Sequence, residues 1–279
     1  MKTKRILNAF TQLGAALVCA GSASGVVLFS DSFDQANTAN YDTAAQDSSQ
    51  GGTLATTINT SSSRVLNEIS GNQLVLERTG GNNQARTRFH DQTAGGRFDF
   101  SSALAGVGAA GSITVSFDWT PSPQTQWIAF SFGTDNNITG EPTVRVNHAT
   151  TDLGVLIEPG GNVQHFDNGS GTTIAGAHSE TGATLPVSIT ASYASLANGG
   201  ALTLESVLVG TTETISAPIS TFAWAFDDGN EIHLELESRA SANAGTSLID
   251  NLSISAVPEP STALLGALGA LGLMRRRRA

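Results

Sequence analysis

The sequence predicts an all-β fold, a two-sheet antiparallel sandwich of jelly-roll type that occupies residues 26–256. The first observation behind this prediction is a series of short stretches in which apolar and polar residues alternate, the pattern of a strand with one buried face. The second is that clusters of Gly, Asn and Pro separate these stretches, as turns separate strands. Residues 26–256 contain neither a helical stretch nor a visible repeat, so the sequence argues against helical, propeller and solenoid folds.

The first half of this segment opens with a short apolar strand at 26–30. A polar loop follows at 35–63, with one weak strand inside it. Strands are expected at 73–77 and 85–89, with a Gly-Gly-Asn-Asn turn between them. The clearest half-buried strand comes next, at 113–119, where Ile, Val, Phe and Trp alternate with Thr, Ser and Asp.

Shorter strands complete the prediction in the second half. Large apolar residues alternate with small ones at 127–132, and Ile and Leu alternate with acidic residues and a histidine at 231–237. A Pro-Gly-Gly-Asn turn at 159–162 joins two of the strands into a hairpin. The other strands expected in this half lie at 144–146, 153–157, 163–166, 187–191, 202–209 and 248–254.

The two ends of this segment resemble a known fold. Residues 28–34 (Leu-Phe-Ser-Asp-Ser-Phe-Asp) and residues 248–254 (Leu-Ile-Asp-Asn-Leu-Ser-Ile) are similar to the first and last strands of concanavalin A-like, or laminin G-like, jelly rolls. The resemblance implies that the terminal strands lie side by side. It also implies a concave sheet of the kind that often binds saccharides, without assigning a particular binding residue.

The N-terminus has the features of a secretory signal peptide, which we assign to residues 1–25. Three basic residues lie within the first five positions, an apolar stretch follows at 13–20, and small residues at 21–25 provide a cleavage region. The one cysteine of the chain, Cys19, falls in this leader. The exported domain therefore contains no disulfide, no thiol nucleophile and no cysteine-ligated metal.

The last 23 residues, 257–279, form a three-part tail: Val257-Pro258-Glu259-Pro260, a run of mostly Ala, Leu and Gly, and four arginines. As a helix, the 18 residues 257–274 would be about 27 Å long, close to the thickness of a hydrocarbon core. The arginines act as a stop and favour the cytoplasmic side. The residues assigned to the membrane anchor and its stop are Leu264, Leu265, Leu268, Leu271, Arg275, Arg276, Arg277 and Arg278.

The order of these three parts resembles the PEP-CTERM sorting signal of Gram-negative bacteria. The resemblance implies processing near Pro258-Glu259-Pro260 by a membrane transpeptidase called exosortase, in organisms that produce exopolysaccharide. It also implies export through the inner membrane, transient anchoring there, and a final place in the envelope, at the outer surface or in the extracellular matrix. Whether the tail is removed or kept as an anchor is left open.

The exported body is strongly acidic. With leader and tail set aside, 7 basic and 23 acidic residues remain, a formal net charge of −16, and none of the basic residues is a lysine. Such a surface repels nucleic acid and anionic lipid. It is compatible with neutral glycans, with divalent cations, or simply with solubility.

Two groups of side chains are candidates for binding. Trp127 is opposite in phase to the apolar residues of its strand and is the best candidate for stacking on a sugar; Trp119, Tyr193 and Trp224 are the other aromatics considered, and the first and last of these lean toward the core. If the terminal strands pair, the carboxylates of Asp31, Asp34 and Asp250 could meet in a structural calcium site, although capping of turns explains them equally well.

These observations favour a non-enzymatic envelope or matrix protein with a jelly-roll body that binds exopolysaccharide. A glycan-active hydrolase or lyase on the same scaffold is the alternative, since Glu231, Glu235 and Glu237 share one strand face, but a catalytic pair with a defined separation is not evident. A purely structural or adhesive surface protein is the third hypothesis. The histidines lack zinc-site spacing, and no nucleophile elbow or phosphate-binding loop is present.

Overall fold

The computed structural model confirms the all-β prediction: within the residues it describes, sixteen strands form two antiparallel sheets. The predicted signal peptide and the tail after Glu259 lie outside these residues. No helix in the described part of the chain has the length and hydropathy needed to cross a membrane. The described residues are 25–34, 36–37, 54–58, 66–78, 85–91, 104, 106–122, 127–134, 146, 151–167, 169–179, 184–195, 200–215, 218–223, 232–239 and 245–259.

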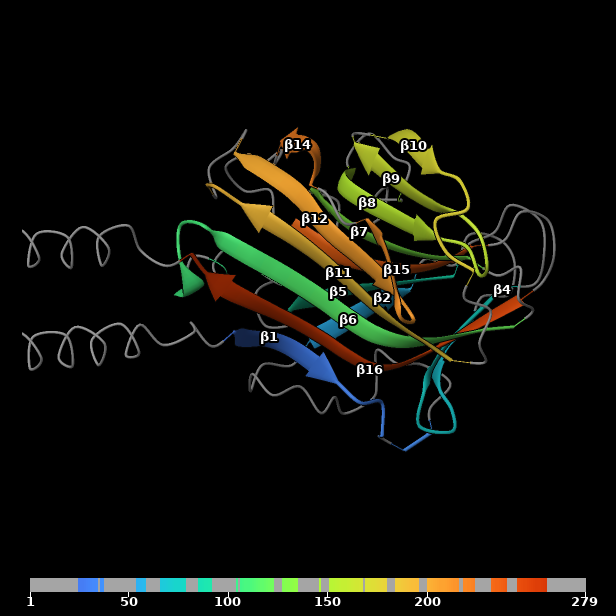
Figure 1. The fold of residues 1–279 in the computed structure, drawn as a ribbon. Helices are drawn as coiled ribbons and strands as arrows, with labels where there is room; N and C mark the ends of the chain where they lie inside the picture. The colour runs from blue at the N-terminus through green and yellow to red at the C-terminus, as the bar shows by residue number, and fades with distance from the viewer. Residues whose placement is uncertain are drawn as a thin grey trace, which may run out of the picture.

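The first sheet has nine strands among the described residues, in the order β13-β12-β11-β6-β16-β4-β3, with β1 beside β16 and β14 beside β12. Figure 1 shows its long central strands, β6, β11 and β16, running across one face of the molecule. The strands of this sheet are β1 (Val26–Asp31), β3 (Leu66–Ile69), β4 (Leu74–Arg78), β6 (Gly111–Ser122), β11 (Leu185–Tyr193), β12 (Ala201–Val209), β13 (Thr212–Ile215), β14 (Ile219–Ala223) and β16 (Gly245–Pro258).

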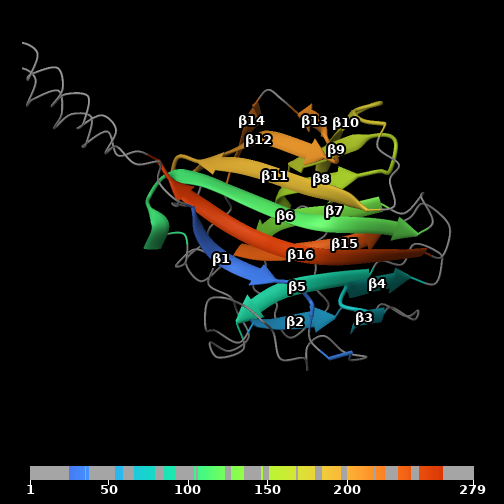
Figure 2. The ribbon, with the colours of Figure 1, turned by 60° about the horizontal axis from the view of Figure 1, so that its bottom comes forward.

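The second sheet has seven strands in the described chain, in the order β10-β9-β8-β7-β15-β5-β2, and lies behind the first (Figure 2). The chain crosses between the sheets several times, for instance from β5 to β6 and from β6 to β7, as in a jelly roll. The strands of this sheet are β2 (Leu54–Ile58), β5 (Ala85–Asp91), β7 (Trp127–Thr134), β8 (Thr151–Ile157), β9 (Val163–Asp167), β10 (Ser170–Ile174) and β15 (Ile232–Arg239).

The first and last strands lie side by side, as the resemblance to jelly rolls implied. β1 pairs with the second half of β16, from Val26 opposite Ala256 to Asp31 opposite Leu252. On its other side β16 pairs with β6 along most of its length, and a register shift interrupts that ladder between Asp250 and Ser253. The C-terminal strand is therefore a central element of the first sheet, with a neighbour on either side.

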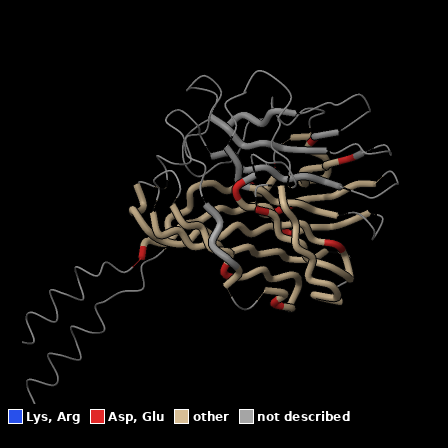
Figure 3. Tube along the Cα trace, turned by 90° about the horizontal axis from the view of Figure 1, so that it is seen from above, with Lys and Arg blue, Asp and Glu red and all other residues tan. Residues whose placement is uncertain are grey.

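Acidic residues lie at scattered places along the described strands and their connections (Figure 3). Basic residues are also present on described strands, for instance Arg88 of β5 opposite Glu235 of β15. The acidic balance of the body as a whole is given by its sequence.

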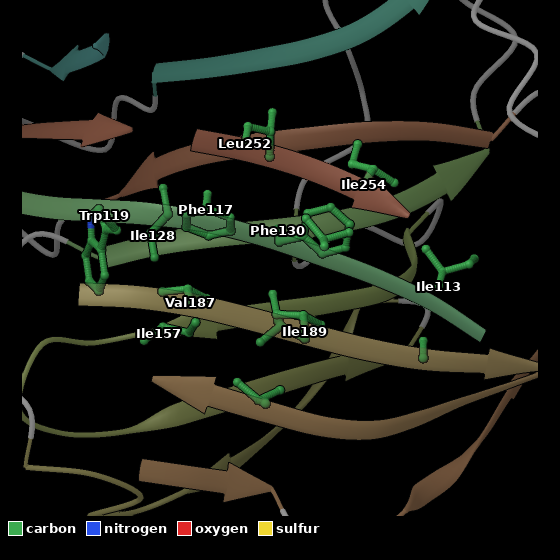
Figure 4. Close-up of a cluster of buried hydrophobic side chains, with 14 of the residues drawn as sticks. Ile113, Phe117, Trp119, Ile128, Phe130, Ile157, Val187, Ile189, Leu252 and Ile254 are labelled. Atoms are coloured by element: carbon green, nitrogen blue, oxygen red, sulfur yellow. The ribbon is translucent and has the colours of Figure 1, made fainter. Parts of the chain in front are cut away.

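The core lies between the two sheets and is built by strict alternation along the strands. Every second residue of β6 is buried, from Gly111 to Pro121, which confirms the prediction for this strand. Figure 4 shows Phe117 and Trp119 of β6 facing Ile128 and Phe130 of β7. Since β6 is buried between neighbours on both edges and a second sheet on one face, it fixes the register of the whole sandwich.

Several elements differ from the sequence prediction. Val146, expected in a strand, lies in a turn and is fully buried. A short helical turn, absent from the prediction, surrounds Leu104, and the Gly108 amide donates to its carbonyl at 3.0 Å. β3, β10, β13 and β14 were not predicted. β10 carries no hydrophobic alternation because nearly all its residues are exposed, so the strand follows from pairing with β9 rather than from its own sequence.

Candidate functional site

Trp127 begins β7 on the outer face of the seven-stranded sheet. Its neighbours Ile128 and Phe130 belong to the core, whereas Trp127 is half-buried and packs against a separate group of buried side chains. The phase predicted for Trp127 is therefore the one observed. We call this group the outer cluster; its buried members are Ala129, Val146, Leu156 and Phe166.

The outer cluster is closely packed. Phe166 lies against the backbone of β10, where a Cβ added to Gly171 would come within 2.5 Å of the ring. Gly171 and Phe166 are partners in the β9–β10 ladder, so the ring covers the backbone of its own partner residue. A larger residue at 171 would therefore collide with the Phe166 ring. Phe166, a member of the group against which Trp127 packs, is in this way held against β10.

Polar groups lie near the end of the β7–β8 ladder. The ladder ends where Ile128 pairs with Ile157, and Glu158 is the next residue after β8. On its other edge β7 pairs with β15, where Arg239 is the partner of Trp127. Asn162 Nδ2 donates to Glu158 Oε2 at 2.7 Å, which holds the carboxylate in the β8–β9 turn. The Glu158 amide also donates to the Asn162 carbonyl at 2.9 Å, as expected for the predicted hairpin.

The turn is tied to the chain that follows β10. Asn162 Oδ1 accepts a hydrogen bond from the Gly176 amide at 3.0 Å, and the His178 amide donates to the Gly161 carbonyl at 3.3 Å. Asn162 therefore links three segments with a single side chain. The candidate site consists of an indole held from one side by the outer cluster and, at the end of the neighbouring strand β8, a carboxylate held by an amide. An indole can stack on a sugar ring, and a carboxylate can accept hydrogen bonds from its hydroxyls.

Two of the other aromatic candidates, Trp119 and Tyr193, are not surface platforms. Trp119 is fully buried, and its Nε1 donates to Ser247 Oγ at 3.1 Å. Tyr193 is also buried, and its hydroxyl donates to the Gly108 carbonyl at 3.3 Å. Trp224 lies outside the described residues. For Trp119 the structure confirms the predicted place in the core, and for Tyr193 it shows that the possible surface role was wrong.

The carboxylates proposed for calcium are only partly brought together. Asp31 is buried at the end of β1, and its Oδ1 accepts a hydrogen bond from the Phe33 amide at 2.8 Å, so it shapes the turn after the strand. Phe33 has a positive φ of 56°, which this bond supports. Asp34 accepts a bond from the Ser32 hydroxyl at 3.2 Å.

Asp250 lies instead beside Asp118, its partner in the β16–β6 ladder. Burial raises the pKa of Asp250; the charges of Asp118 and Asp34 raise it further, and the bond from the Asn251 amide opposes both effects. The Asn251 side chain donates to Asp118 Oδ2 at 2.9 Å. In the described chain no three or more His, Cys, Asp or Glu side chains are grouped so as to hold a metal ion, and calcium binding stays a prediction that melting curves with EDTA and with excess calcium would test.

The acidic face of β15 is described only through its backbone. The register places Glu235 opposite Arg88 of β5 and Glu237 opposite Arg86. Glu231 falls outside the described residues. The hypothesis of a catalytic carboxylate pair on this strand therefore stays untested.

The first half of the predicted tail motif belongs to the sandwich. Val257 and Pro258 are the last residues of β16 and pair with Ser112 and Gly111 of β6. The amide of the next residue, Glu259, donates to the Ala110 carbonyl at 3.1 Å. Pro260 and the residues of the predicted anchor, 264–278, lie outside the described part.

Comparison with known proteins finds one family model. Residues 256–278 match the model described as "PEP-CTERM protein-sorting motif". No curated protein matches the sequence significantly.

Among solved structures, a "Sialidase" aligns with a TM-score of 0.40 and 10% identity over 80% of this chain and 18% of its own. The "Binding domain of Botulinum neurotoxin DC in complex with rat synaptotagmin II" aligns with a TM-score of 0.41 and 10% identity over 82% of this chain and 47% of its own. The chain thus spans less than half the length of either structure. Similarity at this level carries no argument about function.

Proposed function

We propose that this chain, which carries a PEP-CTERM protein-sorting motif at residues 256–278, is a non-enzymatic carbohydrate-binding protein of the bacterial envelope or extracellular matrix. The motif implies export and association with the envelope through the C-terminal tail, and processing by exosortase. In this proposal the β-sandwich is the cargo, and its ligand is the neutral polysaccharide that surrounds the cell.

The observation that carries the proposal is the arrangement around Trp127. The indole is half-buried against the outer cluster, so it would lose little conformational freedom when a sugar stacks on it. Glu158 follows directly on β8, the strand that pairs with β7, and its carboxylate is already oriented by the hydrogen bond from Asn162. An aromatic face with adjacent oriented acceptors suits a pyranose ring, which presents C–H groups on its faces and hydroxyls around its edge.

The charge of the body supports an uncharged ligand. A formal net charge of −16 between leader and tail would repel a polyanionic polymer over distances of about the Debye length, roughly 10 Å at moderate salt. A neutral glucan, galactan or mannan meets no such barrier. Binding is accordingly expected to depend little on ionic strength.

The proposal is tested by measuring the affinity of the purified protein for the exopolysaccharide of the producing organism and for a panel of neutral glycans. Replacement of Trp127 with Ala should weaken binding about tenfold or more, since the aromatic contact contributes on the order of 1.5 kcal/mol. Trp127→Phe, which keeps an aromatic face, should retain most of the affinity. Binding that is unchanged in Trp127→Ala would remove this site from the account.

The same experiment separates the alternatives. Soluble oligosaccharides released by the native protein would favour the hydrolase or lyase hypothesis and direct attention to the acidic face of β15. The absence of any binding to the organism's own polymer and to the panel would leave a structural or adhesive surface protein as the better account.

A further inference from the structure

The end of β16 is held by the turn that precedes β6. Val257 pairs with Ser112, Pro258 pairs with Gly111, and the Glu259 amide donates to the Ala110 carbonyl at 3.1 Å. Pro258 has no amide hydrogen to donate and stands at the end of the ladder, the place in a strand where proline is tolerated. Two residues of the sorting motif are therefore part of a sheet, and the third, Glu259, is bonded to the turn beside it.

Two glycines make this close approach possible. A Cβ on Gly111 would collide with the carbonyl of Val257 and come within 3.3 Å of Pro258 Cα. A Cβ on Gly108 would come within 3.4 Å of Pro258 Cβ. Gly106, in the same turn, has open space around its Cβ direction and is exposed, so the requirement for glycine is confined to the residues that face the motif.

Tyr193 supports the same turn from the core side. Its hydroxyl donates to the Gly108 carbonyl at 3.3 Å and would lie 3.0 Å from a Cβ on Gly111. Burial raises the pKa of Tyr193, and the negative charge of Glu259 raises it further, which places the Glu259 carboxylate within electrostatic reach of this hydroxyl. From the other side, a Cβ on Gly25 would come within 3.4 Å of Val257 Cγ2.

We propose that the folded sandwich latches the first three residues of its own sorting motif, Val257-Pro258-Glu259, and that the processing enzyme binds the motif only after this segment separates from β6 and the turn before it. The inference rests on the proposed sorting of the chain and adds a step to it. The contacts of Gly111 and Ala110 with the segment form the latch, and Tyr193 supports it by holding the Gly108 carbonyl of the turn.

The reason is competition for the same backbone groups. Enzymes that act on peptide segments commonly bind them in an extended form, through main-chain hydrogen bonds at a sheet edge and pockets for alternate side chains. In the folded protein β6 already faces the backbone of Val257 and Pro258, and Ala110 engages the Glu259 amide. The rate of processing is then proportional to the small fraction of molecules in which the end of β16 is open.

Tyr193 acts as a positioning residue in this scheme. Tyr193→Phe keeps the buried ring and removes only the hydroxyl that holds the Gly108 carbonyl. Loss of one such bond should raise the open fraction, and with it the processing rate, about two- to tenfold. If Tyr193 had only a structural role, Tyr193→Phe would lower the melting temperature without changing the ratio of processed to total protein.

The test follows processing of the full-length chain in membranes that contain its processing enzyme, together with amide hydrogen exchange of the purified full-length chain. Ser112→Cys with Val257→Cys, at paired positions whose side chains are both half-exposed, should form a disulfide that closes the latch. Processing should fall more than tenfold in the oxidised form and recover on reduction. Val257→Cys alone controls for the change within the motif.

Glycine variants open the latch instead. Gly111→Ala should speed processing and abolish the protection of the Glu259 amide from exchange, whereas Gly106→Ala should leave both unchanged. Equal processing of the oxidised double-cysteine protein and its single-cysteine control would overturn the latch, and so would rapid exchange of the Glu259 amide in the native chain. If the native chain is never processed while its Glu259 amide is protected, it is the proposed sorting that fails, and the latch stands as a feature of the fold.

Discussion

At the scale of single residues, burial separates the aromatic side chains that hold the fold from the one that can meet a ligand. Trp119 lies in the core with its indole N–H satisfied by Ser247, and Tyr193 is buried at the end of the sheet. Trp127 alternates out of phase with the core residues of β7 and reaches the outer face. Phase along the strand predicted this difference between Trp119 and Trp127 from the sequence, whereas the burial of Tyr193 was not predicted.

Carboxylates near the β16 irregularity provide a prediction about pH. Asp250 has a raised pKa because it is partly buried and faces Asp118 and Asp34. A raised pKa in the folded state means that the folded protein binds this proton more tightly than the unfolded chain, so ionised Asp250 destabilises the fold above that pKa, and the penalty disappears as the pH falls through it.

Asp250→Asn should therefore stabilise the protein at pH 7 and have no effect at a pH below the Asp250 pKa. The amide oxygen can still accept the bond from the Asn251 amide, so the change removes the cost of burying the charge and the repulsion from Asp118 and Asp34. Since Asp250 is largely solvent-screened, the gain should be about 0.5 kcal/mol or less. Urea unfolding at both pH values measures it, with Glu213→Gln on exposed β13 as control; a gain that persists at low pH would contradict the electrostatic explanation.

At the scale of elements, the β8–β9 hairpin organises the candidate site. Asn162 connects Glu158, at the end of β8, to Gly176 after β10. The hairpin itself followed from its Pro-Gly-Gly-Asn turn, but these side-chain partners could not be predicted. Gly176 is fourteen residues away in sequence, and only the return of the chain along β10 brings it to Asn162.

Asn162→Ala should loosen this end of the sheet and weaken glycan binding together. It removes two hydrogen bonds, so we expect a loss of about 1–2 kcal/mol in the free energy of unfolding and faster exchange of the Gly176 amide. Thr172→Ala, on exposed β10, is the matched control and should change neither quantity. If Asn162→Ala lost stability but bound glycans with unchanged affinity, the turn would have no part in the binding site.

At the scale of the whole molecule, hydrophobic alternation predicted the fold class and most of the long strands. It did not predict the strands that form only because a neighbouring strand pairs with them. β10 and β13 are short and mostly polar, and each is held in place by a neighbouring strand. The extent of β16 was missed for a related reason. Its last residues, Val257 and Pro258, carry no strand signal of their own and are fixed by Ser112 and Gly111 across the sheet.

The two ends of the described sandwich lie together. Val26, at the start of β1, pairs with Ala256 near the end of β16, and both strands reach the same end of the molecule in Figures 1 and 2. The expected signal-peptide junction, after residue 24 or 25, and the sorting motif are therefore neighbours in the fold. If the proposed sorting holds the tail at the membrane, the sandwich is attached to it by this end.

The central claim, that the tail delivers a glycan-binding sandwich to the envelope, is tested most directly in the producing cells. Cells that make the native chain or Trp127→Ala would be separated into membrane, matrix and medium fractions, with and without enzymatic digestion of the exopolysaccharide. We predict that the native protein stays with the polysaccharide until it is digested, and that Trp127→Ala is exported and processed equally but passes into the medium. Equal retention of both proteins in the polysaccharide fraction would contradict the account.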